Sequence, residues 1–286
     1  MNGFFLVYKK KGITSHDTIR QIKKKFNLKK VGHTGTLDPF AEGLLIVLVN
    51  NFTKLSFLFE KLHKSYEGIM VFNKNYDTLD ITGKLINENF DIILNLDMIQ
   101  KSFNFFHQKK YLQIPPMYSA VKIRGQKMYN LARKGIKIDI PPKEVHIYEL
   151  KILSFFLKNQ VYFYSKVSKG TYIRSLVRDI AAQMNTYGFL KKLVRVCIGE
   201  YCLKKSKCLF TISKEDLIDE KEFFKNCLKI ILSSYLIKLV RNGIYLDYRQ
   251  IKTYKPFIVL DENYKWIAYY EPIKNNKYHY CPKFFF

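Results

Sequence analysis

Residues 32–43 have the sequence GHTGTLDPFAEG, and the apolar run LLIVLV follows directly at 44–49. Three glycines, a proline and two threonines exclude a regular helix here and predict an ordered loop. The apolar run predicts a buried strand. Asp38 therefore lies on a loop attached to a rigid strand, where residues that act on ligands are often found. Taken alone, the same residues also fit a carboxylate that caps the turn before Pro39.

The remaining chain mixes strands and helices without the regular alternation of a doubly wound sheet. Short apolar or alternating segments predict further strands at 4–8, 66–72 and 161–167. Apolar residues at helical spacing predict one helix that begins at Ser15, expected to be its N-cap, and others at 96–106 and 173–184. This irregular order predicts an α+β fold.

The C-terminal part of the chain has a different amino-acid composition. From about residue 216 the sequence changes to short Tyr-rich pieces that Gly243, Pro256 and Pro272 separate. We predict a large domain over residues 1–215 and a short β-rich region over residues 216–286. The position of this boundary is only approximate, because no low-complexity linker marks it.

The charge of the chain points to a polyanionic partner. Lysine and arginine number 49 against 24 aspartates and glutamates, so the formal net charge is +25. Such a surface attracts polyanions over long distances, which makes a nucleic acid the first candidate. The excess is mostly lysine spread along the chain, and a biased composition would give the same number. No apolar run is long enough to span a bilayer, so a membrane partner is not expected.

The N-terminus and the cysteines bear on location and metal content. The apolar segment 4–8 is too short for a signal-peptide core, so we expect a cytoplasmic protein. The cysteines form no CxxC pair and have no histidine at metal spacing. We therefore expect free thiols and no bound metal. They are Cys197, Cys202, Cys208, Cys227 and Cys281.

Three further motifs follow the loop in the chain. They are KSYE at 64–67 with DTLD at 77–80, IPPMYSAVK at 114–122, and SKGTYIR at 168–174. Together with residues 32–43, and in the same order, they resemble the signatures of the bacterial tRNA pseudouridine synthases that modify the T-loop uridine. Four blocks in register are hard to obtain by chance.

The resemblance implies a fold and a reaction. The fold is the pseudouridine synthase fold, with a central mixed, mainly antiparallel sheet flanked by helices. The reaction isomerises uridine 55 of tRNA: the glycosidic bond to N1 breaks, the uracil turns, and C5 joins C1′. Asp38 corresponds to the family's invariant aspartate. A carboxylate can attack as a nucleophile or stabilise positive charge on the sugar, and the sequence leaves both open.

The same resemblance assigns roles around Asp38. Arg174 is expected to pair with it, which would hold the carboxylate ionised and fix its direction. Tyr66 is expected to stack on the target base, and His33 to fill the space that a flipped nucleotide leaves. Tyr172 and Leu193 are expected to form walls of the base pocket. A surface arginine, core side chains and a turn histidine are the structural alternatives.

The expected RNA contacts are basic side chains. The basic face of the first helix is one candidate surface. A KP pair that the family usually has before Gly12 is here KKKG at 9–12, so we expect a looser turn there. The C-terminal region resembles the family's small RNA-binding domain, but it is short and divergent. The side chains expected to contact RNA are Lys9, Lys122, Arg124, Lys127 and Arg133.

An isomerisation has no net redox change, and no phosphate-cradling glycine loop is present, so we expect no cofactor. The expected partner is the T arm of tRNA, bound by a monomer without a guide RNA. Three rivals stay open: a related synthase that acts on another RNA or through a guide, an inactive binding protein or tRNA chaperone, and a ribosome-associated structural protein.

Overall fold

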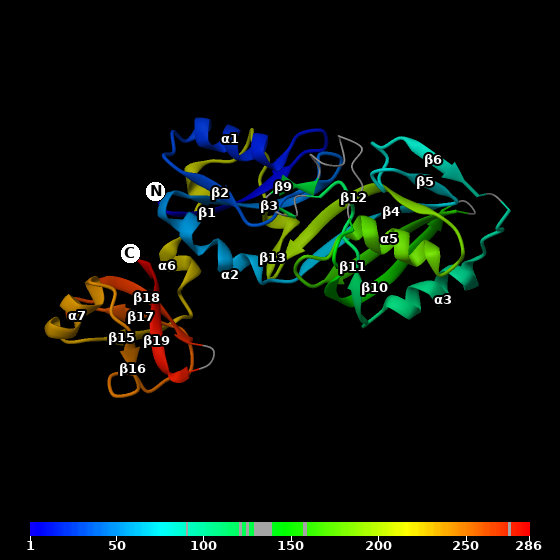
Figure 1. The fold of residues 1–286 in the computed structure, drawn as a ribbon. Coiled ribbons are helices and arrows are strands. Elements are labelled where there is room, and N and C mark those ends of the chain that lie inside the picture. The colour runs from blue at the N-terminus through cyan, green and yellow to red at the C-terminus, as the bar shows by residue number, and fades with distance from the viewer. Residues whose placement is uncertain (90, 120–121, 124–125, 129–138, 157–158, 274–275) are drawn as a thin grey trace.

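A computed structural model of the chain describes residues 1–89, 91–119, 122–123, 126–128, 139–156, 159–273 and 276–286. A large mixed sheet runs through most of it (Figure 1), in the order β14-β1-β3-β12-β4-β11-β10-β7, with β2 beside β3 and β13 beside β12. All its pairings are antiparallel except β12 with β3. The predicted α+β fold with a mixed, mainly antiparallel sheet is confirmed. In chain order the strands are β1 (Gly3–Lys9), β2 (Val31–His33), β3 (Glu42–Val49), β4 (Lys64–Phe72), β7 (Lys110–Gln113), β10 (Lys143–Phe156), β11 (Gln160–Val167), β12 (Gly188–Ile198), β13 (Tyr201–Cys202) and β14 (Ile218–Asp219).

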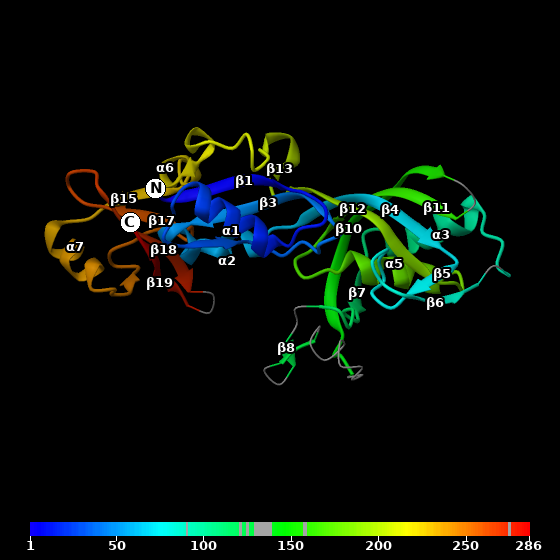
Figure 2. The ribbon, with the colours of Figure 1, turned by 90° about the horizontal axis from the view of Figure 1, so that it is seen from above.

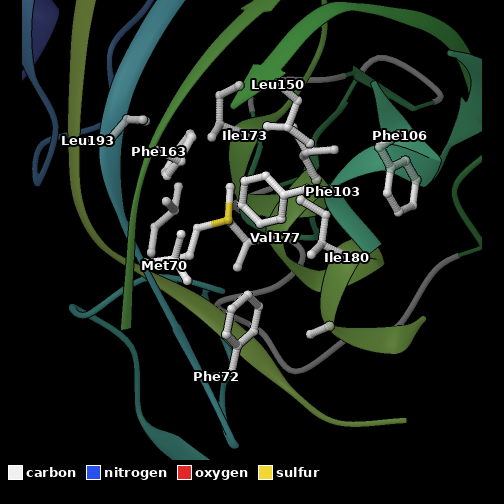
Figure 3. Close-up of a cluster of buried hydrophobic side chains, with 14 of the residues drawn as sticks. Met70, Phe72, Phe103, Phe106, Leu150, Phe163, Ile173, Val177, Ile180 and Leu193 are labelled. Carbon is white, nitrogen blue, oxygen red and sulfur yellow. The ribbon is translucent and has the colours of Figure 1, made fainter. Parts of the chain in front are cut away.

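Two helices cover one face of the β12 to β10 half of this sheet. α3 (Leu96–Phe106) buries Ile99 and Phe103, and α5 (Ile173–Ala182) buries Val177 and Ile180. Figure 3 shows Phe103, Val177 and Ile180 packed with Met70 and other apolar residues of the sheet, in a core that also contains Ile99. The helical spacing seen in the sequence thus becomes the inward face of each helix.

The first helix, α1 (Ser15–Lys25), packs Ile19 and Ile22 against β1 and β3. Thr14, and not Ser15 as expected, is its N-cap, and it forms a capping box with Asp17. Because Thr14 is the N-cap, the Ser15 hydroxyl does not cap the helix and can form hydrogen bonds with another segment of the chain. Alternate β1 residues face a second core that contains Phe4, Phe52 and Phe59. Between β3 and β4 lie a 3-10 helix (Asn50–Leu55) and α2 (Ser56–Glu60).

A second sheet of five strands forms the C-terminal part, in the order β15-β17-β18-β19-β16. Figures 1 and 2 show it beside the N-terminal strands, at the opposite end of the molecule from α3 and α5. It shares a core with the large sheet, in which Phe224 and Tyr269 pack with Phe52. β14 still belongs to the large sheet, and the division after residue 215 stays a prediction. The elements of this part are α6 (Glu220–Phe223), β15 (Leu228–Ile231), α7 (Ser234–Arg241), β16 (Leu246–Asp247), β17 (Phe257–Leu260), β18 (Trp266–Ile273) and β19 (Asn276–Phe285).

Four short strands make two further hairpins. β5 (Lys74–Tyr76) pairs with β6 (Leu85–Glu88), and β8 (Lys122–Ile123) pairs with β9 (Gln126–Lys127). Two short 3-10 helices, Leu203–Lys205 and Lys214–Asp216, lie between β13 and β14. No helix in the described part of the chain has the length and apolar character that crossing a bilayer requires.

One expectation about the cysteines was wrong. Cys197 and Cys202 form a disulfide across the β12–β13 hairpin, with 4.2 Å between their Cα atoms. The hairpin turn at Gly199 places them directly opposite each other, which their spacing in the sequence does not reveal. Cys208, Cys227 and Cys281 are free thiols. The described residues contain no group of three or more His, Cys, Asp or Glu side chains placed to hold a metal ion.

The two halves of the large sheet meet at a very short junction. β12 pairs with β3 through Val194 with Glu42 and Arg195 with Gly43. Gly43 has φ +113°, and a Cβ atom there would lie 2.5 Å from the Arg195 carbonyl oxygen. Only glycine therefore allows the two strands to approach this closely.

We expect Gly43→Ala to destabilise the protein by more than Gly12→Ala. Both glycines have positive φ, so alanine brings backbone strain of about 1–3 kcal/mol at each position. At Gly12 no atom lies within 4 Å of the added Cβ, whereas at Gly43 the backbone of β12 must also move. Urea unfolding of the two variants measures the difference, and equal losses would show that the junction does not need its close approach.

Candidate active site

Asp38 lies on the loop between β2 and β3, and neighbouring elements hold this loop in place. The Ser15 hydroxyl accepts a hydrogen bond from Leu37 N–H at 2.8 Å and lies 3.1 Å from the Leu37 carbonyl oxygen. The Gly12 N–H donates to the Pro39 carbonyl at 2.8 Å. The start of α1 and the preceding turn thus fix both sides of Asp38.

A cavity of about 1020 Å³ opens beside this loop. It is bordered by residues 33–39, the segment 168–174 that leads into α5, and side chains from β4 and β12. The six residues to which the sequence assigned catalytic, base-binding or flipping roles all line it: His33, Asp38, Tyr66, Tyr172, Arg174 and Leu193.

Arg174 is the centre of the polar contacts in this cavity. Its Nε lies 3.0 Å from Asp38 Oδ2, and its Nη1 lies 3.4 Å from Asp80 Oδ2. The same guanidinium donates to the carbonyls of Thr78 and Tyr118, each at 2.9 Å. Arg174 and Asp80 are buried, whereas the Asp38 side chain is 37% exposed. Asp80 and the two carbonyls therefore hold the guanidinium on its buried side, and the free edge of the Asp38 carboxylate faces the cavity.

The electrostatics of Asp38 are a balance of opposing effects. Removal from water raises the pKa of its carboxyl, and the Arg174 charge lowers it. The Asp80 charge raises this pKa again, and Lys9 lowers it. The net direction is upward, so the ion pair offsets the effect of burial only in part.

The three ring-bearing residues of the cavity to which the sequence assigned roles come from three elements. Tyr66 lies on β4 and packs against the core under α5. Tyr172 is the N-cap residue of α5, and its backbone N–H donates to the buried Gln113 side chain at 2.8 Å. Burial raises the pKa of the Tyr172 phenol. His33 ends β2, and its Nδ1 accepts from Gly35 N–H at 3.3 Å. Burial, followed by the Arg195 charge, lowers the pKa of His33.

The sequence assigned no role to two buried charges in this region. Asp80 was noticed only as part of a motif, yet it accepts from Thr82 N–H at 2.9 Å and faces Arg174. Arg195 lies two residues after Leu193 on β12, is 1% exposed and also lines the cavity. A single charged residue within the otherwise apolar stretch 193–198 of β12 was the signal that could have singled out Arg195.

The predicted RNA contact by Lys9 was wrong. Lys9 is fully buried, and its ammonium donates to the carbonyls of Lys10 at 3.0 Å and Ile13 at 2.7 Å. It ties together the turn that was expected to be loose. Burial lowers the pKa of Lys9 to about 8.

The other expected RNA contacts lie in or beside segments that are only partly described. Lys122 and Lys127 are backbone partners in the β8–β9 hairpin. Arg124 and Arg133 lie outside the described residues. Their contact with RNA stays a prediction.

Comparison with known proteins identifies the family. Residues 23–173 match the family model described as the N-terminal domain of TruB family pseudouridylate synthase. The chain belongs to the TruB family. It is 56% identical over its full length to the full length of "tRNA pseudouridine synthase B" of Onion yellows phytoplasma, strain OY-M. The protein of the same name from Acholeplasma laidlawii is 50% identical, over 95% of this chain and 96% of that protein.

Solved structures agree with this TruB-family fold. The structure described as a Cbf5-Nop10-Gar1 complex superposes with a TM-score of 0.67 and 21% identity, over 95% of this chain and 78% of the other. The structure of an H/ACA RNP bound to a substrate RNA containing 2′-deoxyuridine gives a TM-score of 0.66 with 19% identity, at the same coverage of both chains. At these identities the likeness concerns the fold alone.

Proposed function

We propose the following function for this TruB-family chain: it isomerises the uridine at position 55 in the T loop of tRNA to pseudouridine. Family membership and the relatives named tRNA pseudouridine synthase B support the reaction and its tRNA substrate. The observation that carries the residue assignment is the Asp38 carboxylate, which Arg174 fixes at 3.0 Å with its free edge toward the cavity.

Asp38 is the proposed catalytic residue. The bond between N1 and C1′ breaks, the uracil turns, and a bond forms between C5 and C1′, after which C5 loses its proton and N1 gains one. An ionised carboxylate can assist either by bonding to carbon or by stabilising positive charge on the sugar. Both roles need the charged form, and the Arg174 guanidinium favours that form. The pairing also keeps the carboxylate from rotating away from the substrate.

The remaining cavity residues are proposed to hold the flipped base. The Tyr66 ring stacks on the uracil, and Tyr172 and Leu193 form the walls beside it. His33, which ends β2 and lines the cavity, occupies the space that the uridine leaves in the RNA. Extruding a base costs a few kcal/mol, so a stacking replacement lowers the barrier to entry.

Binding of the tRNA is proposed to rest on positive charge around the cavity. The formal charge of +25 draws RNA in, and Lys61, Lys143 and Lys169 line the cavity itself. Lys122, Arg124, Lys127 and Arg133 add contacts to the T arm. The proposed enzyme works in the cytoplasm as a monomer, with neither guide RNA nor cofactor. The C-terminal sheet is proposed to contribute a further RNA surface.

We expect Asp38→Asn to abolish pseudouridine formation while it leaves affinity for tRNA within a few fold. Asparagine keeps the size of the side chain but cannot supply the negative charge, so the rate should fall on the order of 10³-fold or more. Release of label from C5-labelled uridine measures turnover, and filter binding measures affinity. Turnover retained by this variant would contradict the assignment.

The identity of the substrate is tested by a separate experiment, which maps pseudouridine in RNA from cells with and without the gene. Loss at position 55 of tRNA supports the proposal. Loss at another site would favour the rival synthase, and no loss anywhere would favour a binding or structural protein.

We expect Asp80→Asn to shift the acid limb of the rate profile to lower pH. Activity should be present above the pKa of Asp38 and lost as the pH falls through it, because the charged carboxylate is needed. The Asp80 charge raises that pKa, so its removal lowers the midpoint. Single-turnover rates between about pH 4 and pH 8 give the midpoint, whatever the plateau rate. Asp97→Asn, on the exposed first turn of α3, is the control and should leave the midpoint unchanged. A midpoint that stays fixed or rises in Asp80→Asn contradicts the electrostatic account.

A further inference from the structure

Arg195 is a buried cation that forms no ion pair with an acidic side chain among the described residues. It is 1% exposed, and none of the ion pairs between the described residues includes it. Its Nε donates to the Leu44 carbonyl at 2.8 Å and its Nη2 to the Gly35 carbonyl at 3.0 Å. A longer contact of 3.5 Å joins its Nη1 to the Thr36 carbonyl. The Tyr66 hydroxyl and the Asp38 charge also lie close enough to favour the charged form of Arg195.

These contacts link the loop of Asp38 to the strand of Tyr66. Gly35 and Thr36 precede Asp38 by three and two residues, and Leu44 lies in the buried part of β3. The backbone of Arg195 pairs with Gly43 on one side and with Tyr66 on the other. One side chain therefore contacts the loop that carries the proposed catalytic carboxylate and the tyrosine proposed to hold the base.

The position of Arg195 in the sheet makes this link important. β1, β2, β3 and the Asp38 loop lie on one side of the short β12–β3 junction, and β4, which carries Tyr66, lies on the other. The junction has only two residue pairs, so backbone pairing alone gives it little resistance to twisting. The guanidinium adds a planar, multi-donor contact across the same place.

Stability alone is a poor explanation for such a residue. Removing a guanidinium from water is unfavourable, and carbonyl groups offset this cost less well than a carboxylate would. Burial accordingly lowers the pKa of Arg195. A well-packed apolar side chain at this position would avoid the cost of desolvation.

We propose that Arg195 is a positioning residue of the isomerase reaction: its guanidinium, bound to the Gly35 and Leu44 carbonyls, and its backbone, paired with Tyr66, set the position of Asp38 relative to Tyr66. Arg195 acts through these two residues. The inference rests on the proposed function, because it assigns Asp38 and Tyr66 to the same uridine.

The test compares Arg195→Lys, Arg195→Gln and Arg195→Met with the wild-type full-length chain. Single-turnover rates at saturating T-arm RNA measure the chemical step, and filter binding measures Kd for the same RNA. A displacement of about 1 Å can cost 10²-fold in rate, so we expect a loss of about a hundredfold in Arg195→Met. Lysine keeps the charge but cannot reach several carbonyls at once, so we expect a smaller loss of about tenfold. Kd should change by less than a few fold.

A matched control is Arg178→Lys on α5. Arg178 also donates to a backbone carbonyl, that of Ile114 at 3.0 Å, but it does not line the cavity. The single-turnover rate of the Arg178→Lys variant should stay close to that of the wild type. Thermal melting of every variant shows whether it is folded at the assay temperature.

Each outcome decides for or against the inference. A folded Arg195→Met with the wild-type rate overturns it, and so does a loss confined to Kd. If Arg195→Met is unfolded, the lysine and glutamine variants decide by the same criteria. If none of the three folds at a reduced temperature, Arg195 is a stability residue and the inference fails. A wild-type chain that makes no pseudouridine rejects the proposed function itself, whereas an active wild type with unaffected variants rejects only the role of Arg195.

Discussion

The buried Arg174 guanidinium joins parts of the cavity that come from distant segments of the chain. It contacts Asp38 from the β2–β3 loop, Asp80 from the turn after β5, and the carbonyl of Tyr118. An arginine suits this position because its planar group presents several donors in fixed directions. Two carboxylates close to one another repel, and a single guanidinium between them allows both to stay near the cavity. The arrangement leaves only Asp38 partly open to solvent, which gives one acid a free edge toward a substrate.

The rest of the site places further cations around Asp38. Lys9 and Arg195 are almost fully shielded from water, and both donate to backbone carbonyls of the segments that border the Asp38 loop. Buried cations without acidic partners reduce stability, but they hold backbone that has no regular secondary structure. Arg195 also lines the cavity, together with Lys61, Lys143 and Lys169, and these positive charges complement a phosphate-bearing substrate.

Much of the fold followed from local patterns, and the exceptions have physical causes. The strands β1, β3, β4 and β11 were predicted from apolar runs or alternating residues, and the helix α3 from apolar residues at helical spacing. Strands β10 and β12 were missed, since register shifts at bulges interrupt their alternation. The gathering of the cavity residues came from a resemblance to a family. Burial of Lys9, the disulfide between Cys197 and Cys202, and the contacts of Arg195 depend on tertiary pairing that no local pattern encodes.

The central claim is that Asp38, held by Arg174, faces the sugar of a uridine drawn into the cavity. A crystal structure of the chain with T-arm RNA that carries pseudouridine at position 55 tests it most directly. The account predicts the base against Tyr66, the Asp38 carboxylate within about 3.5 Å of C1′ and the ion pair with Arg174 intact. A modified base bound outside this cavity, or an Asp38 side chain turned away from the sugar with the ion pair broken, would contradict it.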